Sequence, residues 1–223
     1  MMIGKIKQFN FKSLLILNTF ALIVTSYFFK NFICIGVYTL FFFISLITTK
    51  YGLKTIKKLN LLQNIRTEGP ANHFKKSNTP TMGGIFIIIP FLILLLIITI
   101  NLGSPKLLLL LFTIFGFFFT GFLDDYLSIK NRKNTGLRSK EKFILQSIIS
   151  IIFIFIAYEN DLINPIIKIS ESWEIDTSIF IFPISFLVLV GISNSVNLTD
   201  GLDGLAAGCS GIVFYGLGTE ILM

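Results

Sequence analysis

Long apolar runs alternate with short polar segments along the chain. The clearest runs are residues 82–100, 107–123, 143–158, 179–196 and a Gly-rich run at 205–223. About 20 apolar residues cross a bilayer as a helix, so these runs predict membrane-spanning helices. Two earlier runs, 13–29 and 32–48, are separated by Lys30 and Asn31, which leaves open whether the first one spans or lies on the membrane surface. We predict an all-α, polytopic integral membrane helix bundle with about six transmembrane helices, in a single transmembrane domain over residues 1–223.

Positive charge gathers between alternate runs. The chain has 19 Lys and Arg against 12 Asp and Glu, and seven of the 19 fall within residues 50–76 and six within 130–142. The loops on the other side hold only Lys106 and Lys168. By the positive-inside rule, the loops at about 50–80, 124–142 and 197–204 are therefore cytoplasmic. There they face anionic lipid headgroups or a phosphorylated substrate, and we expect no nucleic-acid partner.

A pair of adjacent carboxylates, Asp124 and Asp125 in GFLDDY, follows the uncharged run 107–123. Carboxylates at the end of a membrane segment usually bind a cation, a proton or a polar partner, because a buried bare charge is costly. Neighbouring side chains on a helix diverge by about 100°, so the two would divide roles, one toward Mg²⁺ and one toward a proton or second ligand. The simpler alternative is that both end the span and meet loop lysines.

A second polar segment, residues 194–208, reads NSVNLTDGLDGLAAG. Asp200 and Asp203 stand three residues apart, and Gly201 and Gly204 follow them directly. Glycines permit tight turns whose exposed N–H groups can hold an anion or a base. The alternative is a turn in which the two aspartates cap the next helix.

Amides and lysines at the cytoplasmic ends complete the candidate chemistry. Asn194 and Asn197 lie near the end of a predicted span, where buried amides need partners and indicate a polar cavity. Lys76 precedes the string TPTMGG and could neutralise a diphosphate, while Lys140 or Lys142 could bind phosphate as a mobile point charge. Ordinary positive-inside lysines are the alternative in each case.

The three polar segments would converge on one membrane face if the helices form a bundle. Together HFKKSNTPTMGG, GFLDDY and NSVNLTDGLDGLAAG resemble the phospho-N-acetylmuramoyl-pentapeptide-transferase family, over about residues 59–208. The TPTMGG and NLTDGLDGL strings separate this family from related polyprenyl-phosphate N-acetylhexosamine-1-phosphate transferases, which share mainly the acidic pair and a looser DG motif. The resemblance implies a bacterial inner-membrane protein whose active face is cytoplasmic.

The resemblance also implies a reaction. Undecaprenyl phosphate attacks the β-phosphorus of UDP-MurNAc-pentapeptide with Mg²⁺ as cofactor, giving lipid I and UMP. The family's catalytic acidic pair, also its candidate metal ligands, falls on Asp124 and Asp125. A proton-accepting aspartate and a covalent aspartyl intermediate both stay open. The substrate-binding residues that it implies are Lys76, Lys142 with Lys140 as runner-up, Asn194, Asn197, Asp200, Gly201, Leu202 and Asp203.

The chain departs from the family's pattern in two respects. It has fewer spans than members of the family, and it lacks their third aspartate, in a Gly-Asp-x-Gly context, and their His-rich loop. We therefore expect the N-terminal portion of a larger transferase, inactive by itself, with a decayed remnant as the alternative. A proton or cation transporter would place acids at mid-span, where this sequence has none. Membrane lipid is an expected partner, and a monomer and a homodimer both stay open.

Overall fold

The structure, a computed structural model, describes residues 32–59, 61, 80–131, 136–170, 173–200 and 204–222. Its helices are α2 (Phe32–Lys58), α3 (Ile85–Leu102), α4 (Pro105–Lys130), α5 (Ser139–Glu159), α6 (Ile181–Thr199) and α7 (Leu205–Leu222). A short 3-10 helix, η2 (Ser178–Phe180), precedes α6. The strands β1 (Ile166–Ser170) and β2 (Trp173–Asp176) pair as an antiparallel hairpin. The predicted helical membrane architecture is confirmed, and the hairpin is an addition to it.

Four described segments are long and apolar enough to cross a membrane, namely Ile85–Leu102, Pro105–Lys130, Ser139–Glu159 and Ser178–Thr199. The prediction of about six spans is therefore too high for the part of the chain that the structure describes. The predicted run at 13–29 lies outside the described residues. Helix α7 has 18 residues in all, and Leu205–Phe214 within it forms a shorter apolar stretch. The protein is a multi-pass membrane protein.

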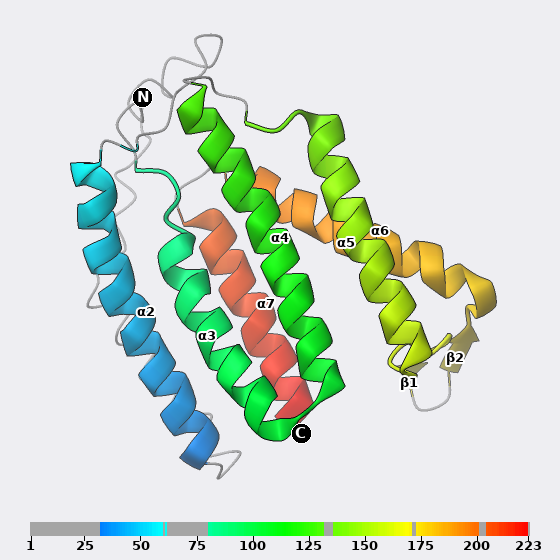
Figure 1. Ribbon diagram of the computed structural model, residues 1–223. Coiled ribbons are helices and arrows are strands. Elements are labelled where there is room, and N and C mark those ends of the chain that lie inside the picture. The colour runs from blue at the N-terminus through cyan, green and yellow to red at the C-terminus, as the bar shows by residue number, and fades with distance from the viewer. Residues whose placement is uncertain are drawn as a thin grey trace, which may run out of the picture.

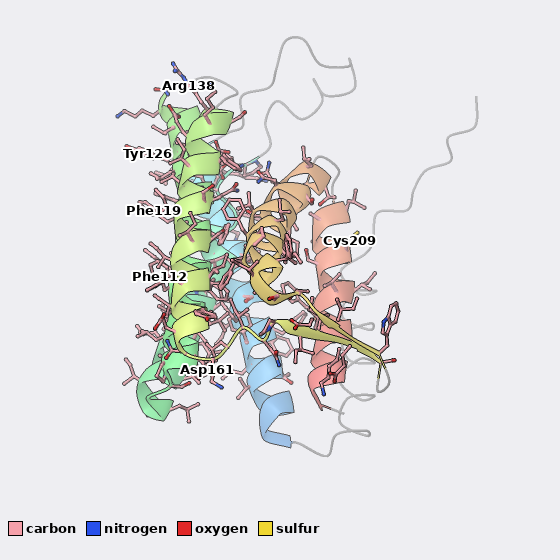
Figure 2. All side chains as sticks on the ribbon, turned by 90° about the vertical axis from the view of Figure 1, so that its right-hand side faces the viewer. Phe112, Phe119, Tyr126, Arg138, Asp161 and Cys209 are labelled. Carbon is pink, nitrogen blue, oxygen red and sulfur yellow. The ribbon has the colours of Figure 1, made fainter. Side chains whose placement is uncertain are left out.

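Helices α2 to α5 run antiparallel, each beside the next (Figure 1). The last turns of α2 and α4 and the first turn of α5 lie toward one end of the bundle, and the β1–β2 hairpin lies toward the other (Figure 1). Figure 2 shows Arg138, just before α5, and Asp161, just after it, at these opposite ends. The basic residues in the last turns of α2 and α4 and at the start of α5 thus lie at the end opposite the loop that holds Asp161 (Figure 1 and Figure 2), as the charge pattern predicts.

Helices α4 and α5 approach closely through small side chains. A Cβ added at Gly116 of α4 would lie 3.1 Å from the Ile149 side chain of α5. Thr113 and Thr120 are buried on α4, and their hydroxyls donate to carbonyls four residues earlier, at 2.8 and 3.0 Å. Their hydroxyls are satisfied within the helix, and small residues are what membrane helices need for close packing.

The outer side of α4 carries a row of aromatic rings. Phe115, Phe119, Phe122 and Tyr126 follow one another with ring centroids 6.1, 6.5 and 6.1 Å apart. Phe119 and Tyr126 are about half exposed. Figure 2 shows Phe112, Phe119 and Tyr126 along one outer edge of the bundle. An apolar outer surface of this kind suits contact with lipid tails rather than water.

Candidate functional site

The acidic pair lies inside α4 and not in a loop after it. The sequence predicted a span that ends at residue 123 and a loop over 124–142, but residues 124–130 continue α4 and residues 139–142 begin α5. The helix continues because Leu127 and Ile129 extend its apolar pattern and no Gly or Pro interrupts it. Asp124 and Asp125 therefore hold fixed positions on a rigid element, pointing to different sides of it.

Asp124 is held by residues just before α5 and in its first turn. Leu137 donates its backbone N–H to Asp124 Oδ1 at 2.9 Å. Lys142 Nζ lies 3.7 Å from Asp124 Oδ2, an ion pair rather than a hydrogen bond. The Lys142 side chain is 17% exposed and that of Asp124 31%, so water screens this pair less than an open surface pair.

The position of Lys142 follows from how α5 begins. Arg138 donates its backbone N–H to Glu141 Oε2 at 2.9 Å, which satisfies one of the free donors at the start of the helix. Lys142 is then in the first turn of α5, on the side facing Asp124. Lys140 is exposed, and no ion pair joins it to an acid among the described residues. The geometry favours Lys142 over Lys140.

Asp125 contacts a different segment, the turn before α3. Met82 donates its backbone N–H to Asp125 Oδ2 at 3.2 Å, and the Thr81 side chain is a further hydrogen-bond partner. Met82 has φ +64°, a left-handed conformation that is uncommon outside glycine. The Thr81 N–H donates to the Leu61 carbonyl at 3.2 Å, which ties the same turn to the segment after α2. The described part of TPTMGG, from residue 80 on, thus meets GFLDDY, in keeping with the predicted convergence of these segments on one membrane face.

A buried amide network joins α5 to α6. Asn194 Nδ2 donates to Gln146 Oε1 at 2.8 Å and to the Val190 carbonyl at 2.9 Å, and Gln146 Nε2 donates to Ser193 Oγ at 3.1 Å. Asn194 therefore has the polar surroundings predicted from its place near the end of a span. Gln146 was not among the predicted residues; its one signal in the sequence is its place four residues after Lys142, on the same helix face.

The other candidates are not brought to the acidic pair by the described residues. Asn197 and Asp200 are exposed at the end of α6, and Asp200 closes that helix. Among the hydrogen bonds and ion pairs of the described residues, none joins either side chain to Asp124 or Asp125. Four predicted substrate-binding residues lie outside the described residues, namely Lys76, Gly201, Leu202 and Asp203.

The acidic pair fits Mg²⁺ in its chemistry. Asp124 and Asp125 offer hard oxygen donors from adjacent positions at the end of the bundle where the basic loops lie. Mg²⁺ is usually held by one or two carboxylates together with substrate phosphates and water. A full protein cage of three or more Asp, Glu, His or Cys does not occur in the described ranges.

These features define a multi-pass membrane helix bundle. Its two adjacent aspartates and Lys142 lie together at the end of the bundle that carries the basic residues. The chain belongs to glycosyl transferase family 4, whose family model matches residues 107–222. Residues 76–88 also match the phospho-N-acetylmuramoyl-pentapeptide-transferase signature 1. The first match covers the acidic pair, the α5–α6 network and α7, and the second covers the turn that binds Asp125.

Curated relatives extend this match. The chain is 82% identical, over 222 residues and its whole length, to a phospho-N-acetylmuramoyl-pentapeptide-transferase of Prochlorococcus marinus (strain MIT 9312). It is 47% identical over 181 residues, 81% of this chain and 48% of the relative, to the protein of that name from Prochlorococcus marinus (strain NATL2A). It is 40% identical over 175 residues, 78% of this chain and 54% of the relative, to that from Halalkalibacterium halodurans. The chain spans about 62% of the length of the relative that is 82% identical to it.

Proposed function

We propose that this chain forms the acidic-pair part of a transferase site. The reaction moves phospho-MurNAc-pentapeptide from UDP-MurNAc-pentapeptide to undecaprenyl phosphate and gives lipid I and UMP. The relatives named phospho-N-acetylmuramoyl-pentapeptide-transferase support the proposal. The observation that carries it is the meeting of Asp125 with Thr81–Met82, and of Asp124 with Lys142, at one end of a membrane bundle.

The chemistry required is the approach of two anions. Lys142 lies beside Asp124 with most of its side chain enclosed, so its charge offsets phosphate repulsion with little screening. When bound by Asp124 and Asp125, Mg²⁺ would supply further positive charge to the diphosphate. In one route an aspartate accepts the proton of the lipid phosphate, which attacks the β-phosphorus and displaces UMP. In the other, an aspartate attacks the β-phosphorus and displaces UMP, and the lipid phosphate then displaces the aspartate to give lipid I.

The remaining assignments belong to the same proposal. The residues that contribute to binding of the sugar nucleotide are Asn194, Asn197, Asp200, Gly201, Leu202, Asp203 and Lys76. The site faces the cytoplasm of a bacterial inner membrane, because the basic loops lie at its end of the bundle. Residues 1–223 act as one transmembrane domain.

The test is direct binding of UDP-MurNAc-pentapeptide to the purified chain in lipid nanodiscs with Mg²⁺, measured by calorimetry. Lys142→Met removes the charge beside Asp124, and Lys140→Met is the matched control from the same helix turn. We expect Lys142→Met to weaken binding about tenfold, and Lys140→Met to stay within about twofold, because of these two lysines Lys142 pairs with Asp124 and Lys140 does not. Absence of binding by the wild type, or equal effects of the two variants, would overturn the proposal.

A further inference from the structure

Gln146 is a buried polar residue that the proposed reaction does not yet use. It lies in α5, is 1% exposed, and belongs to the buried face that also holds Ser150, Ile154 and Ala157. Inside a membrane bundle an amide without partners is costly, so its side chain must be hydrogen-bonded. It is bonded twice, to Asn194 and to Ser193 of α6.

One backbone carbonyl fixes the direction of every bond in this network. The Val190 carbonyl can only accept, so the Asn194 atom 2.9 Å from it must be the nitrogen Nδ2. The Gln146 atom that accepts from the same nitrogen must then be the oxygen Oε1. Gln146 Nε2 is left to donate to Ser193 Oγ. The network therefore has one orientation, in which neither amide can be turned over without losing a bond.

This orientation uses both hydrogens of the Asn194 amide. One goes to Val190 within α6 and the other to Gln146 across to α5. Among the described residues, no hydrogen bond is made to Asn194 Oδ1. The Asn194 atom left for another partner is thus the acceptor Oδ1. Gln146 fixes this orientation by accepting from Asn194 Nδ2.

Helix α5 links this acceptor to the acidic pair. Lys142 and Gln146 are four residues apart, so they lie on the same face of α5, one turn from each other. Lys142 contacts Asp124 of α4, and Gln146 contacts Asn194 of α6. One face of α5 therefore sets the positions of a charged group and of a neutral acceptor from the two helices beside it.

We propose that Gln146 is a positioning residue, which holds Asn194 so that its carbonyl oxygen Oδ1 accepts a hydrogen bond from an N–H or O–H group of the sugar nucleotide. This inference rests on the proposed function. It assigns Gln146 a role through Asn194 and no contact with the substrate. If Gln146 and Asn194 only stabilised the fold, replacing Gln146 by an apolar residue of similar shape would change stability and leave sugar-nucleotide binding unchanged.

The test combines Gln146→Leu, Asn194→Ala and the double variant in the full chain, in nanodiscs with Mg²⁺. Affinity for UDP-MurNAc-pentapeptide is measured by calorimetry. We expect each single variant to bind about tenfold more weakly, and the double variant to bind no more weakly than Asn194→Ala alone. Gln146→Glu keeps an acceptor for Asn194, and Ser193 can then donate, so this variant should restore binding to within about threefold of the wild type. Ser150→Ala, one turn further along the same face, is the control and should bind like the wild type.

A second readout reports the pair without the substrate. With ¹⁵N-labelled asparagine side-chain amides, Gln146→Leu should shift the Asn194 Nδ2 signals, and Ser150→Ala should leave them in place. Unchanged Asn194 signals in Gln146→Leu, wild-type affinity of Gln146→Leu, or additive effects in the double variant would overturn the inference. A wild type that binds no sugar nucleotide would instead overturn the proposed function, on which the substrate part of the inference depends.

Discussion

The backbone of Gly136 lies directly against the backbone carbonyl of Asp124. An ideal Cβ at Gly136 would overlap that carbonyl oxygen and lie 2.8 Å from Asp124 Oδ1. The next residue, Leu137, donates its N–H to the same carboxylate. Gly136 and Leu137, just before α5, thus pack onto Asp124 at a distance that only glycine permits at position 136.

Gly136→Ala tests this close approach. The added methyl must push the connection away from α4, and the Leu137 N–H bond to Asp124 would be lost with it. We expect sugar-nucleotide affinity to fall about tenfold, since a hydrogen bond to a charged group contributes roughly 1.5–3 kcal/mol. Calorimetric titration measures this. Gly121→Ala, where a Cβ meets nothing within 4 Å, should bind like the wild type.

The two aspartates should control different parts of the backbone. Asp125 accepts from the Met82 N–H, and Asp124 accepts from the Leu137 N–H. We expect Asp125→Ala to speed hydrogen exchange at the Met82 amide about ten- to a hundredfold and to leave Leu137 unchanged, with the reverse for Asp124→Ala. Exchange measured by NMR on the chain in nanodiscs reports both sites, and each variant is the control for the other. If the two variants changed hydrogen exchange equally at Met82 and at Leu137, the assignment of one backbone hydrogen bond to each aspartate would be wrong.

Much of this site follows from the sequence, because the charge rule places distant segments on one side. That rule and the family resemblance predicted TPTMGG and the acidic pair on one membrane face, while the contact between Met82 and Asp125 comes from the structure. The choice between Lys140 and Lys142 needed more, because it depends on where α5 begins. Residues two apart on a helix point about 200° from each other, so a small error in the helix start changes which lysine meets Asp124.

Other features could not be predicted from the sequence, each for a physical reason. The span before the acidic pair was predicted to end at residue 123 because polar residues begin there, yet Asp124 and Asp125 do not stop a helix that has apolar residues beyond them. The outer hairpin was missed because its strands have only five and four residues, too few for alternation to stand out. Gln146 was missed because a single polar residue barely changes the hydropathy of a long run.

The contact between α2 and α3 depends on Gly52. A Cβ there would overlap the Phe86 ring, and one turn earlier Thr48 Oγ1 donates to the Phe86 carbonyl at 2.8 Å. We expect Gly52→Ala to displace the ring and to lower stability by about 1–3 kcal/mol, seen as a lower thermal unfolding midpoint in nanodiscs. Gly36→Ala in the same helix meets nothing within 4 Å and should not lower it. An unchanged midpoint for Gly52→Ala would show that α2 packs differently.

One face of the β1–β2 hairpin is apolar, and the other carries an ion pair. The pair Ile167 and Ile175 lies opposite across the strands, as does the pair Lys168 and Glu174, whose side chains form an ion pair at 3.0 Å. Residues directly opposite share a face, and so do residues two apart along a strand. Trp173 therefore lies on the face of Ile175, and it is 59% exposed.

We expect this apolar face to rest on the outer membrane surface. Tryptophan is enriched where headgroups meet hydrocarbon, and the hairpin directly connects the ends of two membrane helices, α5 and α6. Trp173 is the single tryptophan of the chain, so its fluorescence reports this position alone. Lipids brominated near the headgroup should quench it strongly, and lipids brominated near the chain end should quench it weakly. Strong quenching by aqueous iodide, with none by either lipid, would place the hairpin in water and contradict the prediction.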